Sequence, residues 1–293
     1  MATSGRSDRA SFRRALRRNA AKLARELPWI NHPDPWAVLV SEVMLQQTQS
    51  SRVIEPWTRF LEAFPTPKAC ADAPLSDVLR LWSGLGYHRR AKSLHDAAII
   101  IRDVYRGDVP STVADLRRLP GIGEYSANAV GSFAFGHPVA VVDTNVGRVL
   151  ARAITNRTLS VRDARVEANE LLPRKDSASF NQAMLDLGAR YCTAKPRCEV
   201  CPVRAHCKWQ REGGPDPAPR SAGVSRPQSA FRGSDREVRG RVLAALRERP
   251  RSTQQLVADL EGVDANRSVD LIADLVADGL VERRGRVVHL SGD

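Results

Sequence analysis

The sequence predicts an all-α protein that is followed by a small C-terminal α+β unit. Helix-length apolar patterns alternate with Pro and Gly breaks from Trp36 to about residue 210, and alternating β patterns are scarce before residue 280. Residues 213–230 contain three Gly, four Pro and three Ser, a composition typical of a flexible linker. Apolar runs at Leu280–Val281 and Val287–Leu290 flank a turn and indicate one β-hairpin.

Composition places the chain among ordinary globular proteins. Of its 293 residues 42% are hydrophobic and 27% charged, which excludes a chain disordered throughout, a collagen and a small disulfide scaffold. The longest apolar runs are five residues, far below the roughly 20 of a membrane span, and the N-terminus lacks the apolar stretch of a signal peptide. We therefore expect a cytoplasmic protein that is a monomer and does not interact with membranes.

The charge is strongly basic and unevenly distributed. A net charge of +12 and a pI near 10.1 suit a polyanionic partner, although the Arg bias of a GC-rich genome would produce the same excess. The whole excess lies in residues 1–230, because residues 231–293 carry eleven Arg and eleven acidic residues. Much of it lies in a predicted basic helix over residues 10–27, with Phe12, Leu16 and Leu23 on one side.

The remaining elements follow from the positions of the breaks. The expected helices after the basic one cover residues 36–49, 75–82, 91–105 and 113–119, then begin at Glu124 and Val146. In the C-terminal unit, Ser234 and Glu237 form a capping-box pattern, Ser252 caps a second helix, and a third runs from about Arg267 to Gly279. Three helices and a hairpin resemble a winged helix. Its third helix carries one Arg against three Asp, so we expect this unit to contribute little to binding a polyanion.

Two motifs suggest ligand binding. Leu119-Pro-Gly-Ile-Gly123 lies between two predicted helices, and the amides of such a turn before a helix N-terminus suit a DNA phosphate, although a turn that only joins helices has the same form. Cys192, Cys198, Cys201 and Cys207 lie within 16 residues, which indicates a metal site; this spacing fits zinc and a [4Fe–4S] cluster about equally. The isolated Cys70 is interpreted as a buried residue.

Two carboxylates are candidates for acid–base chemistry. Glu42 lies between Val38 and Leu45 on one predicted helix, where partial desolvation would make it hold its proton more tightly and act as a general acid. Asp143 precedes the helix beginning at Val146, where it is ionised and could stabilise a developing cation. Each has an ordinary alternative, a solvated glutamate and a simple N-cap.

Together these features resemble the helix-hairpin-helix DNA glycosylases with an iron–sulfur loop, most closely the A/G-specific adenine DNA glycosylases. The resemblance covers residues 27–210. It is carried by Leu-Pro-Trp29, Ser-Glu42-Val-Met-Leu-Gln-Gln-Thr-Gln49, Leu-Trp-Ser-Gly-Leu-Gly-Tyr87, Leu-Pro-Gly-Ile-Gly123, Val-Asp143-Thr-Asn-Val146, Phe-Asn-Gln-Ala-Met-Leu-Asp-Leu-Gly188 and the cysteine loop. It implies a [4Fe–4S] cluster on the four cysteines and two helical subdomains that flank an active-site cleft. The implied domains are residues 1–28, 29–139, 140–212, the linker 213–230 and 231–293.

The resemblance also implies the activity and its residues. It implies a base excision repair enzyme that flips adenine out of A·8-oxoguanine or A·G pairs in double-stranded DNA and hydrolyses its glycosidic bond. Glu42 would protonate adenine, and Asp143 would stabilise the sugar cation. Tyr125 and Asn145 would orient Asp143 and the sugar. The implied DNA contacts are Gln46, Gln47, Thr48, Tyr87, Gly121 and Gly123, with Trp29 in the base pocket. Tyr125 replaces the nucleophilic Lys of bifunctional relatives, which predicts a monofunctional enzyme.

Several departures from the family pattern bear on specificity. The gap after Cys192 is five residues instead of the usual six, Thr144 replaces a common Gly, and Ile30 follows Trp29 where Arg or Gln is common. The Phe-Ser-His motif that reads 8-oxoguanine in many relatives is missing, which leaves the preferred opposite base open. Two alternatives are a thymine or uracil mismatch glycosylase, which would lack Glu42, and a non-enzymatic iron–sulfur DNA-binding regulator.

Overall fold

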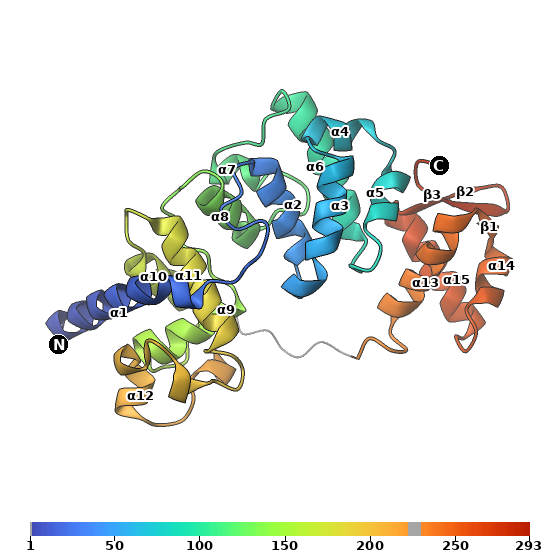
Figure 1. Cartoon of the computed structure of the whole chain (residues 1–293). Coiled ribbons are helices and arrows are strands. Elements are labelled where there is room, and N and C mark those ends of the chain that lie inside the picture. Colours follow the sequence, from blue (N-terminus) through green and yellow to red (C-terminus); the bar gives the residue numbers. More distant parts are fainter. Residues whose placement is uncertain (1, 222–229) are drawn as a thin grey trace. The chain divides into compact units, whose positions relative to one another are not determined.

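The computed structural model describes residues 2–221 and 230–293 (Figure 1). The chain forms two compact units, and each is built from two separate stretches. Unit 1 joins the N-terminal residues up to Pro33 with the stretch that starts at Gly123, and unit 2 joins Asp34–Ile122 with the C-terminal residues. The sequence placed these divisions at 28/29 and 139/140. The second lies earlier because α8 (Glu124–Phe133) packs against α11 (Ser177–Arg190) of unit 1.

Unit 1 is helical and forms around the long helix α11. The apolar side of α1 predicted from the sequence is buried, since Phe12, Leu16 and Leu23 are all at most 1% exposed. The helix begins earlier and ends sooner than predicted. The elements of unit 1 are α1 (Ala2–Leu23), α8, α9 (Thr144–Val149), the π-helix η2 (Leu150–Thr155), α10 (Val161–Leu171), α11, η3 (Cys198–Val200), η4 (Arg204–His206), α12 (Lys208–Glu212) and η5 (Ala218–Arg220).

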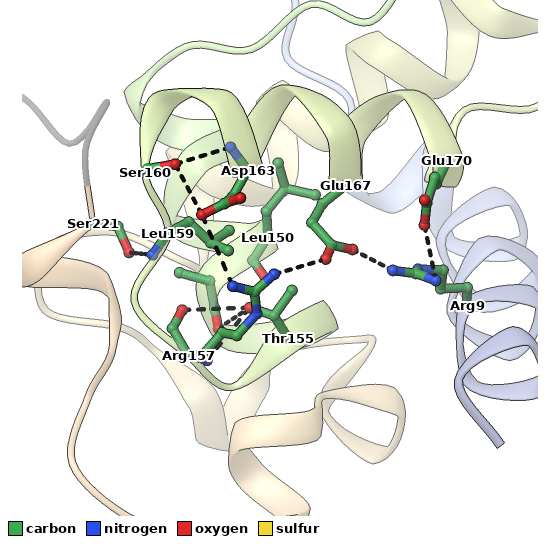
Figure 2. Close-up of polar contacts among 11 residues, drawn as sticks. Arg9, Leu150, Thr155, Arg157, Leu159, Ser160, Asp163, Glu167, Glu170 and Ser221 are labelled. Carbon is green, nitrogen blue, oxygen red and sulfur yellow. Dashed lines mark hydrogen bonds and ion pairs between the residues drawn. The ribbon is translucent and has the colours of Figure 1, made fainter. Parts of the chain in front are cut away.

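Charged contacts attach α10 to the rest of unit 1, as Figure 2 shows. Arg9 of α1 pairs with Glu167 and also contacts Glu170 at 3.0 Å between Nη1 and Oε2. Glu167 accepts a second guanidinium from Arg157 at 3.2 Å. Part of the positive charge of the N-terminal helix is therefore neutralised inside the protein.

The first half of the predicted linker is part of unit 1, which corrects the sequence interpretation. Asp216 accepts two hydrogen bonds from Arg152, at 2.8 and 2.6 Å, and Ala218 is fully buried. The Ser221 hydroxyl accepts from the backbone N–H of Leu159 at 3.1 Å (Figure 2). Gly and Pro counts cannot detect these contacts, since they depend on residues about 60 positions earlier. The predicted linker residues 222–229 lie outside the described part of the chain.

Unit 2 contains a helical segment followed by the winged-helix-like unit. The helices predicted over residues 75–82 and 91–105 lie within two residues of their observed limits, whereas those predicted over 36–49 and 113–119 end at Leu45 and Leu116. The helices over residues 54–63 and 67–72 had no individual prediction, and Cys70 is fully buried, as expected. Its elements are α2 (Pro35–Leu45), η1 (Ser50–Arg52), α3 (Ile54–Ala63), α4 (Pro67–Asp72), α5 (Leu75–Leu81), α6 (Arg89–Val104) and α7 (Val113–Leu116). Among the residues described, no helix has the length and apolar character needed to cross a membrane.

The C-terminal unit has the predicted three helices and hairpin, with one further short strand. Its elements are α13 (Asp235–Glu248), β1 (Arg251–Ser252), α14 (Thr253–Asp259), α15 (Ala265–Ala277), β2 (Val281–Arg284) and β3 (Val287–Leu290). The antiparallel sheet has the order β1-β3-β2, with Val281 opposite Leu290. The capping box occurs at Ser252 and Gln255, whereas Glu237 accepts from the N–H of Gly233 rather than of Ser234.

Candidate active site and cysteine loop

Glu42 lies on α2, a helix buried along almost its whole length. Asp34 caps this helix by accepting from the backbone N–H groups of Trp36, at 3.0 Å, and Ala37, at 3.3 Å. Glu42 is only 6% exposed, and Val38, one turn earlier, is buried as well. The helix thus brings a single carboxyl into a largely apolar environment, where it can exchange a proton with a bound group.

Arg90 closes the C-terminal end of α2. Its Nη1 donates to the carbonyl oxygens of Val43, Met44 and Gln46 at 2.6–2.9 Å, and its Nη2 donates to Thr48 Oγ1 at 3.1 Å. The last carbonyls of a helix have no partner within the helix, so this guanidinium replaces the usual glycine cap. Sequence reasoning missed Arg90, and the available signal was the absence of Gly or Asn after α2.

The same guanidinium connects two turns that carry predicted DNA contacts. Gln47 and Tyr87 both have left-handed backbone conformations, with φ of 57° and 49°. Arg90 also donates to the carbonyl of Gly86 at 3.1 Å, and its Cζ lies 5.4 Å from the centre of the Tyr87 ring. The turn after α2 and the turn before α6 are therefore held together inside unit 2.

Gly121 is fixed by both its conformation and its surroundings. Its φ is +74°, and a Cβ at this position would lie 2.7 Å from Ser93 Cβ, so only glycine fits. Its carbonyl accepts from Gln46 Nε2 at 3.1 Å. Gly123, the first residue of the second stretch of unit 1, is the N-cap of α8 and has open space where a Cβ would lie. The motif therefore contains one glycine required by packing and one beside an open helix N-terminus.

Asp143 is held at the start of α9 in unit 1. Its Oδ1 accepts from the Val146 N–H at 2.8 Å, and its Oδ2 accepts from Asn145 Nδ2 at 2.6 Å. Burial raises the pKa of the Asp143 carboxyl, and these two donors together with Arg148 act in the opposite direction. Desolvation is therefore the larger effect, although the sequence suggested that the helix start would dominate.

Arg148 connects this carboxyl to the cysteine loop. Its Nη2 donates to Asn145 Oδ1 at 2.5 Å and to the Gly188 carbonyl at 3.1 Å, and its Nε donates to the Cys192 carbonyl at 2.7 Å. A Cβ on Gly188 would lie 2.6 Å from Asn145 Cβ, so α9 and α11 can approach closely only at a glycine. Sequence reasoning missed Arg148. Its position three residues after Asn145, on the same helical face, was the available signal.

The other predicted residues of unit 1 lie near its core. Tyr125, in the first turn of α8, is half-buried and packs against that core. Trp29 is buried in the segment after α1. Glu42, Gln46, Gln47, Thr48, Tyr87 and Gly121 belong to unit 2, so the predicted site residues form two sets, each placed within its own unit.

The four cysteines line one small cavity. Cys192, Cys198, Cys201 and Cys207 surround a space of about 30 Å³ together with Trp209 and other side chains. Arg152, 1% exposed, reaches this space with its Nη1 3.5 Å from Cys192 Sγ. A guanidinium beside several sulfurs suits a site that carries negative charge when the thiols are ionised.

Four cysteine thiolates suit either one zinc ion or an iron–sulfur cluster, and the two kinds of site place their ligands differently. One tetrahedral zinc ion needs four sulfurs about 2.3 Å from one point. Within the described residues, no group of three or more His, Cys, Asp or Glu converges closely enough to hold one metal ion. A [4Fe–4S] cluster binds each cysteine to a different iron, so its ligands surround a volume instead of a point.

Comparisons with known proteins identify the family of the chain. Residues 40–174 match the HhH-GPD superfamily of base excision DNA repair proteins. The adenine DNA glycosylase of Mycolicibacterium smegmatis is 42% identical over 266 residues, which cover 88% of each chain. The human adenine DNA glycosylase is 39% identical over 199 residues, covering 63% of this chain and 36% of the human protein.

Solved structures extend the comparison to the fold. A thermostable thymine-DNA glycosylase is 26% identical with a TM-score of 0.64, covering 70% of this chain and 98% of its own. A trapped endonuclease III–DNA covalent intermediate is 27% identical with a TM-score of 0.62, covering 71% of this chain and 97% of its own. The protein is thus a DNA glycosylase of the helix-hairpin-helix superfamily, an enzyme of base excision repair. Within that superfamily the chain belongs to the adenine DNA glycosylase family.

Proposed function

We propose that this enzyme hydrolyses the N-glycosidic bond of adenine paired with 8-oxoguanine or guanine in double-stranded DNA. The buried carboxyl of Glu42 carries the proposal. Adenine is a poor leaving group and departs more readily once a general acid protonates it, and a carboxyl in an apolar helix suits that task. The relatives that carry the name adenine DNA glycosylase add support.

The proposed mechanism divides the work between two carboxyls. The adenine is flipped out of the stack, and Glu42 protonates its N7 and then activates the attacking water. Asp143 stabilises the positive charge that develops at the sugar C1′. Asn145 donates to Asp143, and Asn145 and Tyr125 orient Asp143 and the sugar. Trp29 belongs to the base pocket.

The enzyme is proposed to be monofunctional. A lyase needs an amine that attacks the sugar to form a Schiff base, and the position two residues after Gly123 is Tyr125, whose phenol cannot form one. This separates the chain chemically from endonuclease III, whose trapped covalent DNA intermediate is among the similar structures.

DNA and an iron–sulfur cluster complete the proposal. Cys192, Cys198, Cys201 and Cys207 would hold a [4Fe–4S] cluster, whose contribution is to fold the loop that surrounds it. The proposed DNA contacts are Gln46, Gln47, Thr48, Tyr87, Gly121 and Gly123, of which Gly121 and Gly123 face a phosphate. The enzyme would act as a monomer on the DNA of the bacterial nucleoid, in the cytoplasm.

One set of DNA duplexes distinguishes the proposed activity from two alternatives. The similarity to a thymine-DNA glycosylase structure favours a thymine or uracil mismatch glycosylase as the second candidate, while Glu42 favours adenine. A non-enzymatic iron–sulfur regulator would need neither carboxyl. Purified protein is incubated with duplexes that contain A opposite 8-oxoguanine, G or C, and T or U opposite G, with and without alkali.

We expect adenine release opposite 8-oxoguanine and G, with strand cleavage only after alkali. Glu42→Gln and Asp143→Asn should each lower the single-turnover rate by roughly 100-fold or more. Glu62→Gln, which removes an exposed carboxyl on α3, is the matched control and should leave the rate unchanged. Full activity of Glu42→Gln would remove the proposed acid, and borohydride trapping of wild-type protein on DNA would contradict monofunctional chemistry.

A further inference from the structure

The C-terminal unit packs against the helical segment of unit 2 through charged side chains. Arg89 Nη2 lies 2.5 Å from Asp278 Oδ1, and Arg80 Nη2 donates to Asp293 Oδ1 at 2.7 Å. Arg239 of α13 also pairs with Asp278. The acidic end of α15, which argued against a role in DNA binding, is therefore occupied by contacts within the protein.

This packing creates a pocket next to the two turns described above. The pocket has a volume of about 360 Å³ and lies between α13 and the turns of Gln47 and Tyr87. A water molecule takes about 30 Å³ in the liquid, so the space is large enough for a phosphate with its sugar. Three guanidiniums line it, from Arg52, Arg236 and Arg247, and no Asp or Glu among the described residues does.

Two of the three guanidiniums, those of Arg52 and Arg247, donate to neutral groups. Arg247 donates to Ser83 Oγ at 2.8 Å and to His88 Nε2 at 3.1 Å, and Arg52 donates to the Gly84 carbonyl. In the described part of the chain, the hydrogen-bond acceptors of Arg52 and Arg247 are thus neutral, and the buried Nε of Arg247 has no acceptor. Arg52 is exposed, whereas Arg247 is half-buried, and partly burying a cation without a counter-charge is costly, which favours an anionic ligand beside Arg247.

Arg236 extends this charge toward the rim. Its Nη1 donates to the Tyr87 hydroxyl at 2.6 Å, and its Cζ lies 5.5 Å from the centre of the Tyr87 ring. Arg90 lies 5.4 Å from the same ring centre. The C-terminal unit therefore contacts a residue that we propose to contact DNA, and it places a guanidinium beside it.

We propose that this pocket binds one phosphodiester group of the DNA, so that the C-terminal unit adds a DNA contact through α13 and not through α15 or its hairpin. The planar guanidinium group matches the geometry of phosphate oxygens. A pocket lined by three guanidiniums and, among the described residues, by no Asp or Glu carries more positive charge than the binding of an uncharged nucleobase would require. The inference rests on the proposed function only in taking DNA as the ligand. The sequence predicted that the C-terminal unit contributes little to binding a polyanion. The pocket revises that expectation, because the charges within residues 231–293 sum to zero but are unevenly distributed.

The test measures binding to a fully paired duplex by fluorescence anisotropy between 50 and 200 mM salt. Arg236→Gln and Arg52→Gln are compared with the control variant Arg241→Gln, which removes the same charge from α13. The Arg241 side chain is not part of the pocket and donates instead to the carbonyls of Asp259 and Glu261. Losing one phosphate contact makes the slope of log K against log salt shallower by about 0.9. Between 50 and 200 mM salt, the fold-loss of affinity should therefore be roughly 3.5 times smaller in the variant than in the wild type.

We expect this smaller slope for Arg236→Gln and Arg52→Gln on the paired, A·G and A·8-oxoguanine duplexes alike, and a wild-type slope for Arg241→Gln. Because both residues would reach one phosphate, the double variant should lose no more than about 0.9 in total. Wild-type slopes in folded Arg236→Gln and Arg52→Gln would overturn the inference, as would a loss restricted to one opposite base. A paired duplex requires no excision, so the result stands even if adenine is not the substrate.

Discussion

Replacing Gly188 by alanine should disturb both the stability of unit 1 and the position of Asp143. The added Cβ would lie 2.6 Å from Asn145 Cβ and 2.7 Å from the Asn145 carbonyl oxygen. Overpacking of this kind costs about 1–3 kcal/mol, whereas alanine gains at most about 1 kcal/mol over glycine inside a helix. The opposing Cβ and carbonyl of Asn145 are fixed to the α9 backbone and cannot rotate away, so the cost lies at the upper end of this range and we expect a net loss of about 2 kcal/mol.

The activity should fall by more than this loss of stability alone explains. Asn145 donates to Asp143 at 2.6 Å, and pushing α9 away from α11 moves that donor together with the carboxyl. Thermal unfolding and single-turnover adenine excision below the unfolding temperature measure the two effects separately. Gly240→Ala is the thermal control, because its Cβ would meet nothing within 4 Å. A Gly188→Ala protein with wild-type unfolding temperature and wild-type rate would refute the packing argument.

Two further predictions concern the metal site and pH. Cys198→Ser should lose bound iron and folded yield while Cys70→Ala keeps its iron, and stoichiometric zinc in colourless, anaerobically purified protein would contradict the cluster. Burial and the nearby Arg247, Arg90 and Arg239 lower the pKa of His88 to about 4, so the folded state binds a proton less readily than the unfolded state, whose pKa is 6.5. Stability should fall by about 2 kcal/mol from pH 7 to pH 5 in urea unfolding, and His88→Gln should remove most of this pH dependence.

The sequence predicts what depends on local pattern. Helix periodicity and breaks locate α5, α6 and the C-terminal helices to within a few residues. The spacing of the cysteines alone also predicts a metal loop, which stays a prediction. The apolar side of α1 is also readable, since Phe12, Leu16 and Leu23 follow helical spacing. These features depend on residues that are close together in the chain.

Contacts between distant residues could not be predicted. Arg90 and Arg148 are ordinary basic residues in sequence, and their importance comes from carbonyls that lie more than 40 positions away. The segment 213–221 has linker composition but is held by Arg152 and Leu159. For the same reason the net charge of the C-terminal unit concealed a pocket that forms only when α13 meets the turn of Tyr87.

The packing of α1 has a consequence for synthesis on the ribosome. The buried cluster that contains Phe12 and Leu16 also contains Val203, Cys207 and Ala218, which are made about 200 residues later. At 5–20 residues per second, the apolar side of the first helix waits roughly 10–40 seconds for its partners. During that time the nascent chain exposes a basic amphipathic helix, which suits binding by a chaperone. Completion of the cysteine loop and burial of the first helix are therefore events of the same late stage of folding.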